Sequence, residues 1–77
     1  MNPLNELVLE VAKGLKKLDD FSFIQRNLIV KRIKFGYKLY EDIHDKKHNP
    51  NSLLGWEWEL IQIIEENYYN KILSRFA

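Results

Sequence analysis

The chain of 77 residues contains no cysteine, so neither a disulfide framework nor a thiolate metal site can supplement its core. Glycine and proline are also scarce, with 3 and 2 residues, whereas 45% of the residues are hydrophobic. This composition is typical of a folded protein close to the lower size limit for a single core. We therefore expect one domain over residues 1–77, stabilised by dense helix packing or by self-association.

A strong charge of one sign and a long apolar run are missing as well. The formal net charge of +1 argues neither for nor against nucleic acid as a partner. No apolar run approaches the roughly 18 residues that a membrane span requires. The first residues, MNPLNELVLEVAKG, place no basic segment before their apolar stretch, unlike a signal peptide. The sequence therefore predicts a cytoplasmic protein without a membrane partner.

Recognisable catalytic patterns are absent too. The chain has no glycine-rich phosphate loop and no cysteine nucleophile. His44 and His48 have the spacing of the zinc-protease motif H-E-x-x-H, but Asp45 replaces its glutamate and no third histidine exists. We expect both histidines to be cations near a helix C-terminus. The sequence thus predicts no enzyme, no metal, no cofactor and no small-molecule substrate.

Helix starts are marked by three capping patterns. Asn2-Pro3 and Asn49-Pro50 each place an N-cap asparagine before a proline at the first helical position. Ser22 with Gln25 fits a capping box. Together with the apolar spacing, these signals predict helices over about 3–18, 22–45 and 51–75.

The apolar faces of the predicted helices differ in width. The first helix has a single apolar side, whereas the second has a wide arc that includes Ile24, Leu28 and Phe35. Gly36 within this arc indicates a close approach of another helix. Arg32 also lies in the arc, and we expect its guanidinium to extend to the edge of the core or to belong to an interface.

The predicted fold is all-α, with a long antiparallel hairpin of the second and third helices and the shorter first helix packed on it. At a rise of 1.5 Å per residue, the two long helices would reach roughly 35 Å and the first only about 24 Å. The first helix therefore leaves part of the hairpin uncovered. A homodimer that forms a larger bundle is the expected solution, and packing within the monomer or a different protein partner are the alternatives.

Aromatic residues on the third helix predict where an interaction surface lies. Trp56 lies on the principal apolar face of the predicted helix, which is expected to form the core. Trp58 lies on a different side of the helix, together with Tyr69 and Phe76. Trp and Tyr dominate interface energetics, so we expect a small non-enzymatic protein-interaction module, a regulator, inhibitor or assembly adaptor. The predicted binding residues are Trp58, Tyr69, Ile72 and Phe76, with Glu59 and Glu65 as an acidic rim. The same residues would serve a homodimer equally well.

A nucleic-acid-binding regulator is the alternative function. No acidic residue occurs from Phe21 to Tyr40, and besides Arg32 the cations there predict a phosphate-contacting face; they are Arg26, Lys31, Lys34 and Lys38. In the predicted hairpin, however, Lys38 would face the turn of Glu57 and Glu59, and such pairs would occupy the cations.

Overall fold

The structure is a computed structural model that describes residues 2–67, and these residues form three α-helices and contain no strand. The helices are α1 (Pro3–Ala12), α2 (Phe23–His44) and α3 (Gly55–Glu66). Two short 3-10 helices, η1 (Leu18–Asp20) and η2 (Pro50–Ser52), lie in the connections. The prediction of an all-α, three-helix fold is therefore confirmed. Within the described part of the chain, no helix is long and apolar enough to cross a membrane.

The first two helices begin where the caps predict. The Asn2 side chain accepts a hydrogen bond of 2.8 Å from the backbone N–H of Leu4, and Pro3 stands at the first helical position. Ser22 caps α2 through a capping box: Gln25 N–H donates to Ser22 Oγ at 3.3 Å, and Ser22 N–H donates to Gln25 Oε1 at 3.4 Å. Both caps pair backbone donors that the helix itself leaves free.

The first helix ends six residues earlier than the predicted boundary at Leu18. Gly14 adopts a positive φ of 81°, and its N–H donates to the carbonyl of Val11. The N–H of Leu15 donates to the carbonyl of Glu10 at 2.9 Å. These two bonds form a Schellman motif, which terminates a helix where glycine can adopt the left-handed conformation. The glycine therefore outweighs the apolar spacing that continues to Leu18.

The third helix begins at Gly55, four residues after the predicted start. Asn49 Oδ1 accepts the N–H of Asn51 at 2.9 Å, and this bond caps η2 rather than α3. The following Leu53 and Leu54 are extended. Glu57 then accepts the Leu54 N–H at 2.7 Å and starts α3. The part of the predicted helix beyond residue 67 lies outside the described residues.

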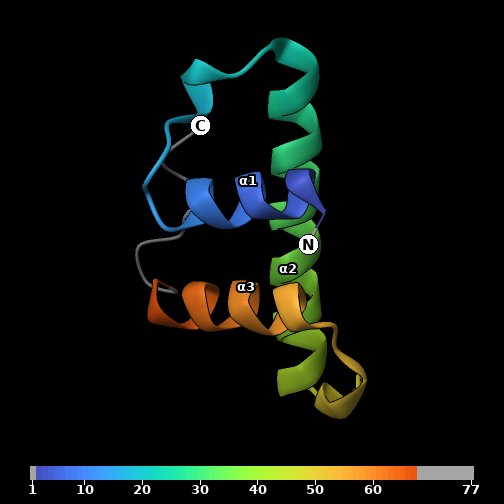
Figure 1. Ribbon diagram of the computed structural model, residues 1–77. Coiled ribbons are helices and arrows are strands. Elements are labelled where there is room, and N and C mark those ends of the chain that lie inside the picture. The colour runs from blue at the N-terminus through green and yellow to red at the C-terminus, as the bar shows by residue number, and fades with distance from the viewer. Residues whose placement is uncertain (1, 68–77) are drawn as a thin grey trace.

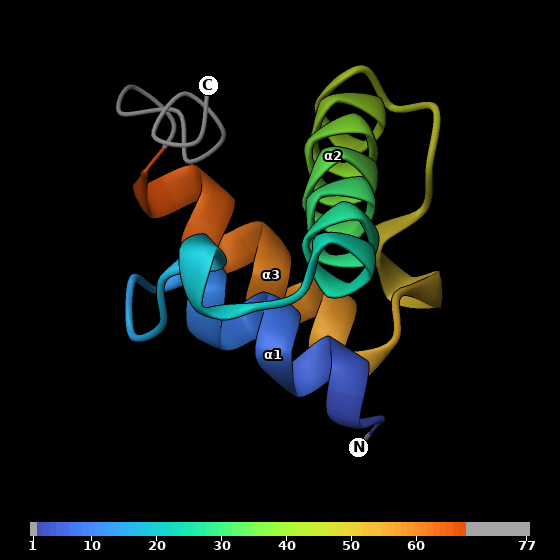
Figure 2. The same cartoon turned by 90° about the horizontal axis from the view of Figure 1, so that it is seen from above.

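The arrangement of the helices differs from the predicted antiparallel hairpin. Figure 1 shows α1 and α3 lying one above the other, both crossing α2 steeply. Figure 2, which looks along α2, shows α1 and α3 side by side and running in the same direction. The ten-residue connection after α2, with the separate turn η2, lets the chain change direction instead of folding back along α2.

Charge pairing follows this arrangement rather than a hairpin. Lys38 Nζ lies 3.1 Å from Asp42 Oδ1 within α2, and Lys13 Nζ lies 2.8 Å from Glu59 Oε1 of α3. The predicted register of Lys38 opposite Glu57 and Glu59 is therefore wrong.

The core lies where the three helices meet. Its most buried side chains come from each helix in turn and are Val8 and Val11 of α1, Ile29 and Ile33 of α2, and Leu60 and Ile64 of α3. Gly36 of α2 faces α3 so closely that a Cβ there would lie 2.6 Å from Leu60 Cδ2 and 3.0 Å from Ile64 Cδ1. The predicted close approach at Gly36 is confirmed.

Candidate interaction surface

The first turns of α2 carry large apolar side chains that the core does not cover. Phe23 and Ile24 are 70% and 71% exposed, and Leu28 is 43% exposed. Figure 1 shows the reason, because this end of α2 projects beyond α1. The early end of α1 at Ala12 shortens the helix that the sequence predicted as cover. Ile24 and Leu28, which the sequence places on the apolar arc of the second helix, are therefore on the surface of the described residues.

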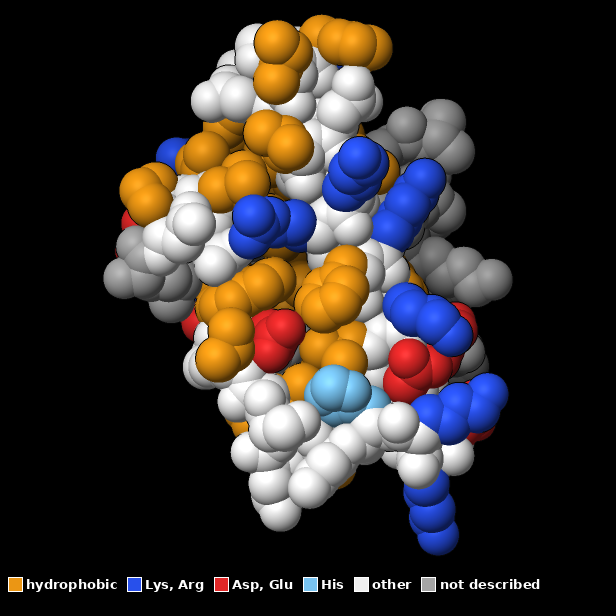
Figure 3. Space-filling view, turned by 90° about the vertical axis from the view of Figure 1, so that its right-hand side faces the viewer, with side chains coloured by type: hydrophobic (Ala, Val, Ile, Leu, Met, Phe, Trp, Pro, Cys, Tyr) orange, Lys and Arg blue, Asp and Glu red, His pale blue; other side chains and the backbone are white. Residues whose placement is uncertain are grey.

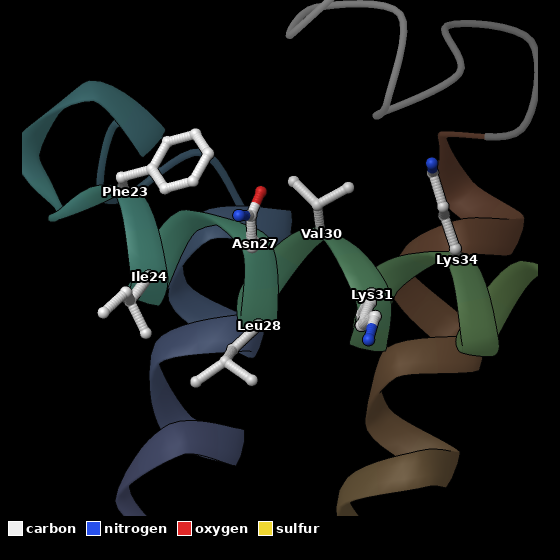
Figure 4. A pocket seen from close by; sticks show the side chains of 7 residues that line it. All are labelled: Phe23, Ile24, Asn27, Leu28, Val30, Lys31 and Lys34. Atoms are coloured by element: carbon white, nitrogen blue, oxygen red, sulfur yellow. The ribbon is translucent and has the colours of Figure 1, made fainter.

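A shallow hollow of about 370 Å³ lies on this exposed side of α2. It is lined by two rows of side chains, with the spacing of ridges on a helix surface (Figure 4). One row contains Phe23, Asn27, Val30 and Lys34, and the other contains Ile24, Leu28 and Lys31. Both rows change from apolar to cationic along the helix. The hollow is thus a groove suited to a side chain of a second helix, because ridges of one helix pack into grooves of another.

Lysines give one end of this surface its positive charge. Lys31 and Lys34 are exposed, and neither forms an ion pair with a described residue. Lys38 differs, because a hydrogen bond from its ammonium to the Asp42 carboxylate, together with the carboxylate's charge, raises the pKa of Lys38. Figure 3 shows Lys and Arg side chains along α2 next to hydrophobic ones. The surface therefore combines an apolar end with a cationic end.

The fourth predicted cation, Arg26, is less available. It is half-buried, and its Nε has no hydrogen-bond partner among the described atoms. The structure therefore separates the four predicted phosphate-contacting residues: Lys31 and Lys34 line the groove, Lys38 pairs with Asp42, and Arg26 lies partly inside.

The predicted surface on the third helix is described in part. Trp58 is 41% exposed, and Leu54, one turn before it, is 61% exposed. Glu65 is exposed near the end of α3, whereas Glu59 pairs with Lys13. Tyr69, Ile72 and Phe76 lie outside the described residues. Leu54, Trp58 and Glu65 therefore form a second row that changes from apolar to charged, here with a negative end.

The two histidines do not form a ligand pair on one helix. His44 is the last residue of α2 and stacks on Tyr40, with ring centroids 5.4 Å apart. His48 lies beyond the helix end, and its Nε2 is 3.2 Å from Ser52 Oγ. In residues 2–67 no group of three or more His, Cys, Asp or Glu side chains is arranged to hold a metal ion.

Sequence reasoning missed Phe23, Ile24 and Leu28 as surface residues. The signal that identifies them is Gly14, which is followed by Leu15, because a glycine and then an apolar residue are typical of a Schellman helix end. A first helix that ends at Gly14 is too short to cover the start of the second helix, and this leaves Phe23, Ile24 and Leu28 on the surface.

Fold and surface together define an all-α protein in which, over residues 2–67, two side-by-side helices cross a third, and α2 carries an exposed apolar–cationic groove. No protein-family model, no curated protein and no solved structure matches the chain.

Proposed function

We propose that the protein is a small non-enzymatic protein-interaction module, with its binding surface on the exposed side of the first half of α2. The observation that carries this proposal is the adjacent exposure of Phe23, Ile24 and Leu28 beside a groove. Contiguous apolar side chains in water lower stability and solubility, and such patches mark interaction sites. Large apolar groups at the centre with charges at the rim are also the usual anatomy of an interface.

The proposed surface differs from the one that the sequence predicted. The residues on α3, above all Trp58, remain a proposed interaction surface, and self-association remains a proposed property. The groove on α2 is added to them because it combines shape, apolar area and charge. A regulator, an inhibitor or an assembly adaptor would each use such a surface.

Affinity capture from a cytosolic extract tests the proposal. Wild-type protein is compared with a Phe23→Ser, Ile24→Ser double variant and with Leu15→Ser as matched control, since Leu15 is 71% exposed but lies outside the groove. We expect one or more partners, or the chain itself, to bind wild type and the control and to be lost with the double variant. Identical bound proteins for all three, with unchanged circular dichroism, would contradict a function of this surface.

Nucleic-acid binding is the second candidate, and the observation that favours it is the exposure of Lys31 and Lys34 without an ion-pair partner among the described residues. The Lys38–Asp42 pair reduces the number of free cations on the same helix. Titration of salt against binding to random duplex DNA tests this candidate, because each phosphate contact contributes about 0.9 to the slope of log K against log salt. Absence of binding at low salt excludes it.

A further inference from the structure

We infer that the groove on α2 receives the row of Leu54, Trp58 and Glu65, which begins at the N-cap of α3 and continues along it, from a second copy of this chain. This inference rests on the proposed function and names the partner of its surface. The contact would join two different faces of the protein, so that α2 of one copy packs against α3 of another.

The spacing of the two rows is the first argument. Phe23, Asn27, Val30 and Lys34 follow one another at intervals of four, three and four residues along α2. Leu54, Trp58, Ile61 and Glu65 repeat the same intervals along α3, with Ile61 turned mostly into the core of its own chain. Rows with the same 3–4 periodicity stay in contact along two helices that pack nearly parallel to each other.

The charges at the ends of the rows are the second argument. A shift of 31 positions places Leu54 opposite Phe23 and Glu65 opposite Lys34. At the apolar end Leu54 then faces Phe23, Trp58 lies opposite Asn27, and at the charged end the exposed carboxylate of Glu65 faces the exposed ammonium of Lys34. An antiparallel arrangement would instead place charged side chains against the apolar ends and desolvate them without a partner. The complementary charges thus favour α3 of a second copy as the partner of α2, with the two helices running in the same direction.

The hollow itself is the third argument. It lies between the ridges of Asn27 and Leu28, and the same register brings Trp58 to this position. An indole is a large apolar group that suits a pocket of this kind, and Trp is the residue type most enriched among interface hot spots. The 41% exposure of Trp58 within its own chain would be reduced by the contact.

Sedimentation velocity across micromolar to millimolar protein tests the inference. We expect concentration-dependent association of wild type, more than tenfold weaker association of Trp58→Ala, and roughly threefold to fivefold weaker association of Lys34→Glu or Glu65→Lys. Combining Lys34→Glu with Glu65→Lys in one chain exchanges the charges and restores association. Lys17→Glu, with the same charge change at an exposed position outside both rows, leaves association unchanged.

Mixing variants distinguishes this contact from one that joins identical faces. A Phe23→Ser, Ile24→Ser variant keeps its α3 row, and Trp58→Ala keeps its α2 groove, so each associates only weakly alone, whereas the mixture forms a 1:1 complex at the concentrations at which wild type associates. A wild type that stays monomeric at millimolar concentration, or associates regardless of Lys34 and Glu65, overturns the inference. The proposed function survives that result if capture of another protein still requires Phe23 and Ile24, and fails if it does not.

Discussion

Arg32 of α2 donates a hydrogen bond from Nη1 to the side-chain oxygen of Asn5, a buried residue of α1. The same guanidinium lies 5.9 Å from the centroid of the Trp56 ring in α3. One half-buried arginine therefore connects the three helices. A hydrogen bond satisfies the buried amide, and a cation–π contact of about 0.5–1 kcal/mol adds to it.

Replacing Arg32 should destabilise the protein, because the buried side chain of Asn5 depends on Arg32 for a hydrogen bond. We expect Arg32→Met to lower the free energy of unfolding by about 1–3 kcal/mol, because the buried Asn5 oxygen loses its donor. The double variant Arg32→Met, Asn5→Leu should lose less than the sum of the single changes, since no unpaired polar group remains. Urea unfolding of the four proteins measures the coupling. If the effects of the two single changes on the free energy of unfolding simply add in the double variant, the Arg32–Asn5 hydrogen bond contributes nothing to stability.

The two glycines of α2 and α3 should respond in opposite ways to alanine. Gly36→Ala should destabilise by about 0.5–2 kcal/mol, because overpacking against buried Leu60 and Ile64 exceeds the gain in helix propensity. Gly55→Ala is the matched control, since nothing lies within 4 Å of its added Cβ. It should be neutral or stabilise by up to about 1 kcal/mol. Thermal and urea unfolding report both, and a more stable Gly36→Ala would contradict the close approach of α3.

A stabilising change is expected at the end of α2. Lys46 has a positive φ of 60°, and the Lys46 and Lys47 N–H groups donate to the carbonyls of Ile43 and Asp42. This is a second Schellman motif, here without glycine at its left-handed position. Lys46→Gly should therefore raise stability by roughly 0.5–1 kcal/mol. Lys47→Gly, at the following position, should instead lower stability slightly, because glycine adds conformational entropy to the unfolded chain, and a gain of the same size there would contradict this interpretation of Lys46.

The Lys38–Asp42 pair predicts a titration shift. The hydrogen bond from Lys38 to the Asp42 carboxylate raises the pKa of Lys38, so Asp42→Asn should move that pKa back toward its ordinary value. Any stability from the pair is present below the pKa of an unfolded lysine and disappears as the pH rises through the raised folded value. Since Lys38 is highly exposed, the effect on unfolding should be small. NMR titration of the Lys38 side chain in wild type and in Asp42→Asn measures the shift.

Features set by neighbouring residues could be predicted from the sequence. The caps at Asn2 and Ser22 depend only on a side chain and a backbone N–H two or three positions away. The same local rule explains the error at Asn49, whose identical Asn-Pro pattern caps the short turn η2. An N-cap residue marks the position where a helical turn begins. Whether that turn continues into an α-helix depends on the residues that follow it.

The packing of the helices could not be predicted in the same way. Crossing of α2 by α1 and α3 depends on how ridges of side chains fit at Gly36 and on the path of the connections. An amphipathic pattern marks the inner face of a helix but not the direction of its neighbour. The exposure of Phe23 and Ile24 follows from that direction and from the length of α1, so the groove on α2 was hidden from sequence reasoning.

The side-by-side packing of α1 and α3 has a consequence for synthesis of the chain. Val8 of α1 shares its core with Leu60 and Ile64, which the ribosome adds more than fifty residues later. Until α3 leaves the exit tunnel, the core faces of α1 and α2 lack the side chains that cover them in the folded protein. A nascent chain that pauses in the connection between α2 and α3 would therefore present its future interior to chaperones and to neighbouring polypeptides.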